Sequence, residues 1–264
     1  MSLFWVCWPA GLSRLREPFL VRLGAMTVIL LRHGRSTSNT AGTLAGRSEG
    51  VELDDRGREQ AQAVAERLGV LPVVEIVRSP LLRCEQTVEP LATRLGLTPM
   101  VEDRIVEVDY GQWTGRTIKE LLAEPLWKVV QQHPSAAVFP EGEGLATVQQ
   151  RAVQAIREHD ARLAAHHGRD VLWVACSHGD VIKSVLSDAM GAHLDSFQRI
   201  VADPASISVV RYTSTRPFVL RTNDTGSDLS VFVPKAEEPT SDEAGAKPDV
   251  ADSSDAVVGG GAGT

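Results

Sequence analysis

Four side chains that could bind an anion or attack an electrophile stand at the end of a short apolar run or soon after it: Arg32, His33, Arg83 and His178. The runs occupy residues 27–31, 73–77 and 171–175. Arginine offers a planar fork of N–H donors that matches the oxygens of a phosphate group. Histidine is neutral near pH 7 and can act as a nucleophile or a base. Two arginines and two imidazoles in one pocket would therefore bind an anion strongly.

Phosphoryl transfer is a chemistry that uses all of these groups. If one imidazole attacks phosphorus, the arginines and the other imidazole stabilise the charge on the equatorial oxygens. The leaving oxygen then needs a proton, and a water molecule must later be activated against the phosphoimidazole. Glu107, in a loop punctuated by Gly111 and Gly115, is the candidate for both proton transfers. This scheme uses no metal ion and no cofactor.

These side chains need a rigid scaffold, and the apolar runs predict one. Each run is typical of a buried strand in a parallel sheet, and ligands bind beyond the carboxyl ends of such strands. One helix is predicted to start at the Asp54 cap and stop at Gly69, and a second to be capped by Ser79 and kinked or ended by Pro90. The other predicted elements are a weak strand at 99–102, helical pieces at 117–132, a long helix at 146–166, a helix that opens at 177–180 and runs to 190, and strands at 207–212 and 217–221.

Composition and charge narrow the classes of function. The chain has 264 residues, of which 43% are hydrophobic and 23% charged, as is ordinary for a soluble globular protein. No run approaches the ~18 apolar residues of a membrane span, so we expect no membrane partner. The formal net charge is −7, but residues 235–264 carry seven acids against two lysines, and the rest of the chain gives no reason to expect nucleic acid. The three cysteines lack metal-ligand spacing and indicate a reducing, cytoplasmic setting.

Three segments are expected along the chain. Residues 1–25 lack the basic-then-apolar order of a secretory signal, and Met26 stands immediately before the first strand. We therefore expect residues 1–25 to be a disordered leader or the result of a start site placed too early. Residues 26–233 are expected to form the catalytic domain. Residues 234–264 have a composition that cannot bury a core, and we expect a disordered acidic tail.

Four short motifs lie in order along residues 27–212, and the set is more specific than any single motif. The matching residues are Arg32, His33, Gly34, Ser36 and Asn39; then Ser79, Arg83 and Thr87; then Glu107, Gly111, Trp113 and Gly115; and finally Ser177, His178 and Gly179. This set resembles the histidine phosphatase superfamily, in the branch similar to phosphoglycerate mutase. The resemblance implies an α/β fold, a three-layer α/β/α sandwich with a mostly parallel central sheet.

The resemblance also implies a role for each matched residue. His33 would carry the phosphoryl group as a phosphohistidine, and Glu107 would be the general acid and base. The implied phosphate-binding residues are Arg32, Arg83, His178, Asn39 and Gly179. Further residues that could contact substrate are Ser36, Gly46 and Tyr110. The implied ligand is a small phosphate ester, with no metal and no cofactor, and a homo-oligomer is compatible with the family because its members often dimerise.

Within this family, a phosphatase and a mutase are competing interpretations. Mutases continue the pattern of Tyr110, Gly111 and Gly115 with Leu-Asn-Lys, whereas Arg-Thr-Ile stands at 116–118 here. Trp113 belongs to the phosphatase version of the loop. We therefore expect a phosphatase acting on small-molecule phosphomonoesters, with a cofactor-dependent phosphoglycerate mutase as the alternative and a catalytically silent phospholigand-binding protein as a further one. Metal-dependent hydrolysis is disfavoured, because the sequence has no carboxylate cluster and no paired-histidine ligand motif.

Two positions depart from the family pattern. Arg35 stands where an acid is common and adds positive charge near the mouth of the site. Gly144 replaces the serine of a Gly-Glu-Ser motif, so that the sequence there is Gly142-Glu143-Gly144. The natural substrate depends on the cap expected at residues 104–145, where side-chain directions do not follow from spacing.

Overall fold

The computed structural model describes residues 26–226. At its centre is a six-stranded sheet in the order β3–β2–β4–β1–β5–β6. The strands are β1 (Met26–Arg32), β2 (Val73–Arg78), β3 (Met100–Val101), β4 (Leu172–Ser177), β5 (Ile207–Tyr212) and β6 (Pro217–Asp224). β5 runs antiparallel to both of its neighbours, and the other neighbouring pairs are parallel. The predicted, mostly parallel sheet is thus confirmed.

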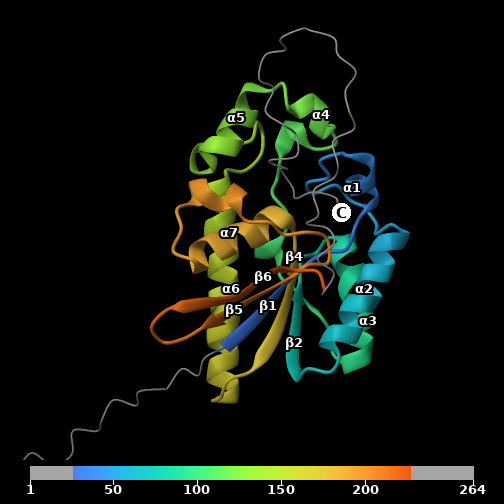
Figure 1. Cartoon of the computed structure of the whole chain (residues 1–264), viewed down its shortest axis with the longest axis vertical. Helices are drawn as coiled ribbons and strands as arrows, with labels where there is room; N and C mark the ends of the chain where they lie inside the picture. Colours follow the sequence, from blue (N-terminus) through green and yellow to red (C-terminus); the bar gives the residue numbers. More distant parts are fainter. Residues whose placement is uncertain (1–25, 227–264) are drawn as a thin grey trace, which may run out of the picture.

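Helices cover both faces of the sheet (Figure 1). α2 (Asp55–Leu68) and α3 (Leu82–Leu95) lie on one face, and α6 (Leu145–His167) and α7 (Gly179–Ala189) lie on the other. The shorter helices are α1 (Thr37–Ala41), α4 (Ile118–Leu121) and α5 (Pro125–Gln132), with 3-10 turns η1 (Asp103–Ile105), η2 (Gly111–Trp113), η3 (Pro134–Ala136) and η4 (Leu194–Arg199). This three-layer α/β/α arrangement confirms the predicted fold class.

The hydrophobic core has two layers, because the side chains of β1 alternate between the two faces of the sheet. Val28 and Leu30 belong to the cluster beneath α6 and α7, whereas Ile29 and Leu31 belong to the cluster beneath α2 and α3. A strand that is buried on both faces has to be apolar along its whole length, which explains the continuous run in the sequence. β1 is therefore held firmly up to its last residue, Arg32.

The start of α3 differs from the prediction. The helix begins at Leu82 with Leu81 as its N-cap, so the prediction that Ser79 caps it is wrong. The Ser79 hydroxyl is instead 2.7 Å from Nε2 of His178, far away in the sequence. The hydroxyl keeps only a long local hydrogen bond, from the Leu81 N–H at 3.4 Å, and its shorter contact is the tertiary one. The sequence pattern at 78–80 contains no sign of that contact.

The middle of α3 also differs from the prediction. The helix continues past Pro90 to Leu95, so Pro90 does not end it. The other predicted effect, a kink at Pro90, stays a prediction. Proline removes one backbone donor from a helix. Val88 and Leu91, on either side of Pro90, are fully buried against the sheet. Burial of this face stabilises the helix enough to offset the lost hydrogen bond.

The other helix predictions are confirmed. Oδ1 of Asp54 accepts a hydrogen bond from the Gly57 N–H at 2.7 Å and caps α2. α6 ends at Gly168 in the left-handed conformation, and α7 begins directly after His178. The predicted leader and tail, with residues 227–233 of the expected domain, lie outside the described residues. Within residues 26–226, no helix is both long and apolar enough to cross a membrane.

Two glycines allow the start of α2 to lie directly against the loop that follows β1. A Cβ on Gly34 would be 2.7 Å from the Gly57 carbonyl oxygen, and a Cβ on Gly57 would be 2.0 Å from the Arg35 carbonyl oxygen. Both distances are below van der Waals contact, and both neighbours are backbone, which cannot rotate away. The glycines therefore fix the path of the chain directly after His33.

The substitution Gly57→Ala is expected to destabilise the protein, although alanine normally favours a helix over glycine by about 1 kcal/mol. The new methyl group overpacks the Arg35 backbone, and such strain costs roughly 1–3 kcal/mol. Urea unfolding of the variant would measure the loss. Gln62→Ala, an exposed position on the same helix, is the control and should change stability little. A variant Gly57→Ala that is as stable as the wild type would contradict this close approach.

Candidate active site

Three neighbouring strands end together at one edge of the sheet. Arg32, the last residue of β1, is paired with Ser177, the last residue of β4. On the other side of β4, Arg78, the last residue of β2, is paired with Cys176, one residue before Ser177. His33, Ser79 and His178 follow these strand ends directly. The register of the sheet therefore brings three segments that are distant in sequence to one place.

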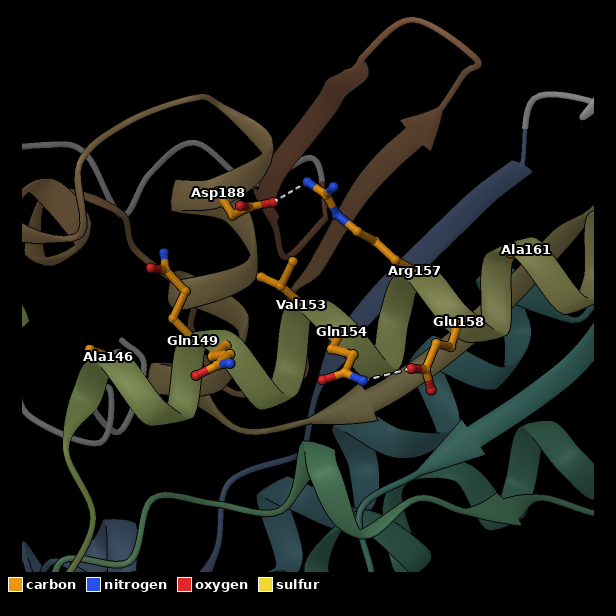
Figure 2. Close-up of a pocket in the computed structure, with 9 residues that line it drawn as sticks. Ala146, Gln149, Val153, Gln154, Arg157, Glu158, Ala161 and Asp188 are labelled. Carbon is orange, nitrogen blue, oxygen red and sulfur yellow. Dashed lines mark hydrogen bonds and ion pairs between the residues drawn. The ribbon is translucent and has the colours of Figure 1, made fainter.

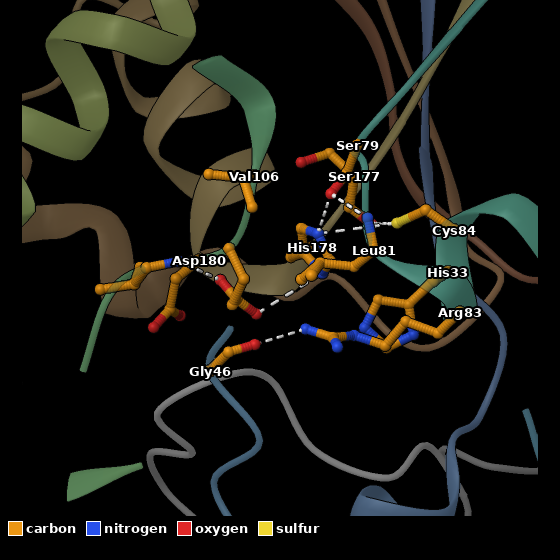
Figure 3. A network of polar contacts seen from close by, with 12 residues as sticks. His33, Gly46, Ser79, Leu81, Arg83, Cys84, Val106, Ser177, His178 and Asp180 are labelled. Carbon is orange, nitrogen blue, oxygen red and sulfur yellow. Dashed lines mark hydrogen bonds and ion pairs between the residues drawn. The ribbon is translucent and has the colours of Figure 1, made fainter. Parts of the chain in front are cut away.

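Arg83 and Glu107 reach this place from other elements. Arg83 lies in the first turn of α3, and Glu107 lies in the loop between η1 and η2. Figure 3 shows Arg83 beside His33, with His178 close by. The five predicted residues Arg32, His33, Arg83, Glu107 and His178 are each at most 4% exposed. The structure thus gathers the two imidazoles, the two guanidinium groups and the carboxyl group in a single buried site.

The His33 ring has one protonated and one unprotonated nitrogen, and its surroundings show which is which. Its Nδ1 is 2.8 Å from the carbonyl oxygen of Gly34, and because a carbonyl only accepts, Nδ1 carries the proton. The lone pair of a neutral ring is then on Nε2. Burial, together with the charges of Arg83 and Arg32, holds the pKa of His33 well below its ordinary value. The ring is therefore neutral at pH 7 and can attack an electrophile through Nε2.

His178 lies next to His33, with 5.2 Å between the ring centroids. Its Nε2 is 2.7 Å from the Ser79 hydroxyl, which accepts a long hydrogen bond from the Leu81 N–H at 3.4 Å and can donate its own proton to Nε2. Burial, followed by the charge of Arg83, holds the pKa of His178 well below its ordinary value. When Ser79 is the donor, the neutral ring carries its proton on Nδ1, which is buried and has no hydrogen-bond partner within residues 26–226. This N–H is available to a ligand oxygen.

The two arginines are fixed by backbone carbonyl groups. Nη1 of Arg32 donates to the Ala202 oxygen at 2.7 Å, and Nη2 of Arg83 donates to the Gly46 oxygen at 2.8 Å. Nη1 of Arg83 is buried and makes no hydrogen bond to any described residue. A buried cationic donor without a partner is costly unless a ligand satisfies it. A phosphate group supplies both the negative charge and the acceptors that this pocket requires.

Glu107 has the properties of a general acid and base. Its Oε1 accepts from the Val108 N–H at 2.9 Å, and its Oε2 is 3.8 Å from Nδ1 of His178. Burial, and after it the charge of Asp180, raises the pKa of Glu107 to about 7. A carboxyl group with that pKa is protonated in a large fraction of molecules near neutrality, and its anion is a competent base.

Asp180 influences this proton, although the sequence analysis assigned it only to the start of the helix that follows His178. It is completely buried, accepts from the Tyr110 hydroxyl at 2.8 Å and forms an ion pair with Lys183 at 3.2 Å. Its negative charge disfavours ionisation of Glu107. The only sign of this effect in the sequence is the position of Asp180, two residues after His178 and in the first turn of a helix.

The variant Asp180→Asn is expected to lower the pKa of Glu107, because it removes a negative charge that favours the protonated form. Carbon-13 NMR titration of the glutamate carboxyl groups would follow this change, with Glu107→Gln to assign the signal. Asp188→Asn, on the surface of the same helix, is the matched control and should leave the Glu107 titration in place. An unchanged midpoint in Asp180→Asn would show that Asp180 does not act on Glu107.

Three further predicted residues lie at the entrance to helices. Ser36 is the N-cap of α1, and its N–H and hydroxyl both donate to Oδ1 of Asn39, at 3.0 and 2.9 Å. The Asn39 Nδ2 donates to none of the described residues, which leaves it available to a ligand. Gly179 is the first residue of α7, where backbone N–H groups have no partner inside the helix.

Gly46 and Tyr110 support other groups of the site. Gly46 accepts from Arg83, as described above, in the left-handed conformation with φ of 51°. Tyr110 is completely buried, and its hydroxyl donates to Asp180. Arg35, which the sequence placed near the mouth, is ion-paired with Asp54 at 2.6 Å. The charge of Arg35 is therefore compensated.

The chain was compared with models of known protein families. The model of the histidine phosphatase superfamily (branch 1) matches residues 28–225 of the chain. The chain belongs to this superfamily. Apart from the first two residues of β1, the match includes all six strands. It also contains all of the predicted site residues.

Relatives in the superfamily include both phosphatases and mutases. The chain is 31% identical over 201 residues to phosphoserine phosphatase 1 of Hydrogenobacter thermophilus, covering 75% of this chain and 92% of the relative. It is also 31% identical over 189 residues to a probable phosphoglycerate mutase GpmB of Yersinia pestis, covering 71% and 85%. Among solved structures, a mycobacterial glucosyl-3-phosphoglycerate phosphatase has a TM-score of 0.67 at 24% identity, covering 75% of this chain and 99% of that one. The last comparison concerns the fold alone.

A hollow of about 540 Å³ lies away from this site, along the exposed face of α6 (Figure 2). Its lining includes Gln149, Val153 and Arg157 of α6 and Asp188 of α7, and the Arg157–Asp188 ion pair of 2.8 Å lies across it. None of the histidine phosphatase residues described above belongs to this lining. Its side chains offer neither a nucleophile nor a cluster of cations.

Proposed function

We propose that this histidine phosphatase hydrolyses small phosphomonoesters through a covalent phosphohistidine on His33. The observation that carries the proposal is Nε2 of His33, a neutral, buried imidazole nitrogen that has no hydrogen-bond partner within residues 26–226 and lies beside two arginines and a second imidazole. These groups supply a nucleophile together with charged and neutral donors for the phosphoryl oxygens. Glu107, with a pKa of about 7, supplies the proton that an alcohol leaving group requires.

In the first step, Nε2 of His33 attacks phosphorus and the bond between phosphorus and the ester oxygen breaks. Glu107 gives its proton to the leaving oxygen, so the alcohol departs neutral. Arg32, Arg83 and His178 hold the three equatorial oxygens while this happens. These contacts are strongest when the charge on those oxygens is greatest, which is the condition for catalysis.

In the second step, water attacks the phosphohistidine. The ionised Glu107 accepts a proton from that water, the N–P bond breaks, and inorganic phosphate leaves with His33 restored. Both steps use side chains of the chain itself for charge and proton transfer. We therefore expect activity in the presence of a chelator.

A phosphatase is the preferred function, and a phosphoglycerate mutase is the second candidate. The mutase is favoured by the GpmB relative and by Tyr110 and Gly111 in the loop after Glu107. The phosphatase is favoured by Trp113 in the same loop and by the phosphoserine phosphatase relative, which covers more of the chain. That relative makes O-phosphoserine the first natural ester to test.

The deciding experiment is hydrolysis of 4-nitrophenyl phosphate and of O-phosphoserine with chelator present, while isomerisation of 3-phosphoglycerate is followed in parallel. Release of phosphate without isomerisation is the expected result. Isomerisation that a bisphosphoglycerate stimulates would establish the mutase instead. A folded protein that binds vanadate but catalyses neither reaction would establish a phospholigand-binding protein.

A further inference from the structure

The carboxylate of Glu107 depends on its backbone for its position. Its side chain receives one hydrogen bond within the described part of the chain, from the N–H of the next residue, Val108. That contact is local and moves with the loop. The loop lies between η1 and η2 and belongs to neither a helix nor a sheet. Whatever fixes the backbone at Glu107 therefore fixes the acid.

Arg151 of α6 holds this loop through its backbone carbonyl groups. Its Nη1 donates to the carbonyl oxygens of Arg104 at 2.7 Å and of Val106 at 2.8 Å, and its Nη2 donates to that of Glu107 at 3.2 Å. A loop without regular structure has to satisfy its backbone acceptors with other partners. Here a single guanidinium group, on a long and rigid helix, satisfies three of them.

Arg47 donates to the same Glu107 carbonyl group as Arg151 does. Its Nε donates to the Glu107 oxygen at 2.9 Å. The preceding residue, Gly46, accepts from the phosphate-binding Arg83 at 2.8 Å. The dipeptide at 46–47 therefore links the backbone of the acid to a cation of the phosphate pocket. A shift of the Glu107 backbone would therefore displace the Arg83 guanidinium group as well.

Glu143 joins the two arginines. Its Oε2 accepts from Nη2 of Arg47 and from Nη2 of Arg151, both at 2.8 Å, and its Oε1 accepts from Nε of Arg151 at 2.9 Å. The Asp109 N–H, in the same loop as Glu107, also donates to Oε2 at 3.0 Å. Burial opposes ionisation of Glu143, but the hydrogen bonds from Arg151 and Asp109, together with the charges of Arg151 and Arg47, lower its pKa. The carboxylate is thus ionised at neutral pH and orients both guanidinium groups.

We propose that Arg47, Glu143 and Arg151 are positioning residues that hold Glu107 in line with the leaving oxygen. The inference rests on the proposed role of Glu107 as the general acid. A misplacement of about 1 Å can cost two orders of magnitude in rate, so a cluster that fixes the backbone of the acid has a measurable effect on catalysis. The glutamate of the Gly142-Glu143-Gly144 sequence acquires a role in this way, independent of the missing serine.

Leaving groups separate this role from a merely structural one. Phenyl phosphate needs a proton on its leaving oxygen, whereas 2,4-dinitrophenol leaves as a stable anion without one. The two esters share an aromatic ring and differ mainly in that need. Since kcat/KM reports the steps up to formation of the phosphohistidine, it isolates the step in which Glu107 acts as an acid.

The experiment compares Arg151→Lys and Glu143→Gln with the wild type on both esters. Lysine keeps the charge but cannot reach three carbonyl groups and two carboxylate oxygens at once. We expect kcat/KM for phenyl phosphate to fall about 10- to 100-fold and that for 2,4-dinitrophenyl phosphate to fall less than about threefold. Arg157→Lys, also on α6 and also ion-paired at 2.8 Å, is the matched control and should change neither. Equal losses on both esters, or no loss on either, would overturn the proposal.

A second set of variants keeps the test decisive. Arg47 is the most exposed of the three side chains, at 38%, so Arg47→Lys provides the same comparison if the other variants do not fold. Glu107→Gln should show the same dependence on the leaving group, and adding Arg151→Lys to it should have no further effect on phenyl phosphate. If Glu107→Gln itself shows no such dependence, the proposed acid is wrong. If only Glu107→Gln shows it, the positioning role alone is wrong.

Discussion

Replacing His33 with alanine is expected to abolish the covalent intermediate and to lower hydrolysis of 4-nitrophenyl phosphate by at least about a thousand-fold, because removal of a nucleophile eliminates the step that the rest of the site serves. The arginines and His178 would remain in place and continue to bind phosphate. Affinity for vanadate or inorganic phosphate should therefore change much less than the rate. Rapid quenching with labelled substrate would detect the intermediate, which as a phosphohistidine should be labile in acid and stable in alkali.

His193→Ala is the control for this prediction, since the side chain of His193 is 71% exposed and its ion-pair partner is Asp195, which is not among the site residues. His178→Ala tests the other imidazole and should still form a phosphoenzyme, more slowly, because it removes a donor but leaves the nucleophile. An alkali-stable phosphoenzyme in the His33→Ala protein would show that another residue is the nucleophile. Labelling of His178 would reverse the assignment of the two rings.

Replacing Glu107 with glutamine is expected to lower the turnover of alkyl and phenyl phosphates by ~10²–10⁴-fold, since the amide can neither donate the required proton nor accept one from water. With 2,4-dinitrophenyl phosphate the first step remains fast and the second becomes slow. The phosphoenzyme should then accumulate as a burst of dinitrophenol followed by slow turnover. In the wild type, kcat/KM for phenyl phosphate should fall as the pH rises through about 7, where Glu107 loses its proton.

The same variant should be more stable than the wild type in mildly alkaline solution. Burial, with a smaller effect of Asp180, raises the pKa of Glu107 from an ordinary 4.5 to about 7 in the folded state. Between these values the unfolded chain ionises the carboxyl group freely and the folded chain does not, so the wild type loses stability as the pH rises from 4.5 to 7. At pH 8 the glutamine variant avoids this cost, and we expect a gain of roughly 1–3 kcal/mol by urea unfolding. The gain should vanish below pH 4.5, and a variant equally unstable at all pH values would contradict the raised pKa.

The sheet could be predicted from the sequence because its strands are buried on both faces. A strand such as β1 has to be apolar at each position, and the first polar residues after it mark its end. Arg32, His33 and His178 were found in this way, as residues that follow such runs. Arg83 and Glu107 were found because they stand at fixed spacings within motifs. In each case the signal lies in a few neighbouring residues.

Only the tertiary structure decided the contacts between segments that are distant in the sequence. Ser79 has the local pattern of a helix cap, but its hydroxyl lies against His178 because the ends of β2 and β4 are adjacent. Pro90 has the local pattern of a helix end, but burial of the surrounding face keeps the helix intact. Local propensities amount to about 1–3 kcal/mol, and packing in a buried core is of the same size or larger, so packing prevails where the two disagree.

The pKa and the position of Glu107 were also decided only by the tertiary structure. Its pKa depends on burial and on Asp180, and its position depends on Arg47, Glu143 and Arg151, which come from three other parts of the chain. Spacing identified Glu107 as an acid but contained nothing about its burial or its partners. The amino-acid sequence by itself determined which groups could take part in phosphoryl transfer and on which kind of scaffold. The folded chain determined how they are oriented and charged, because desolvation and long-range hydrogen bonds exist only once distant segments have packed together.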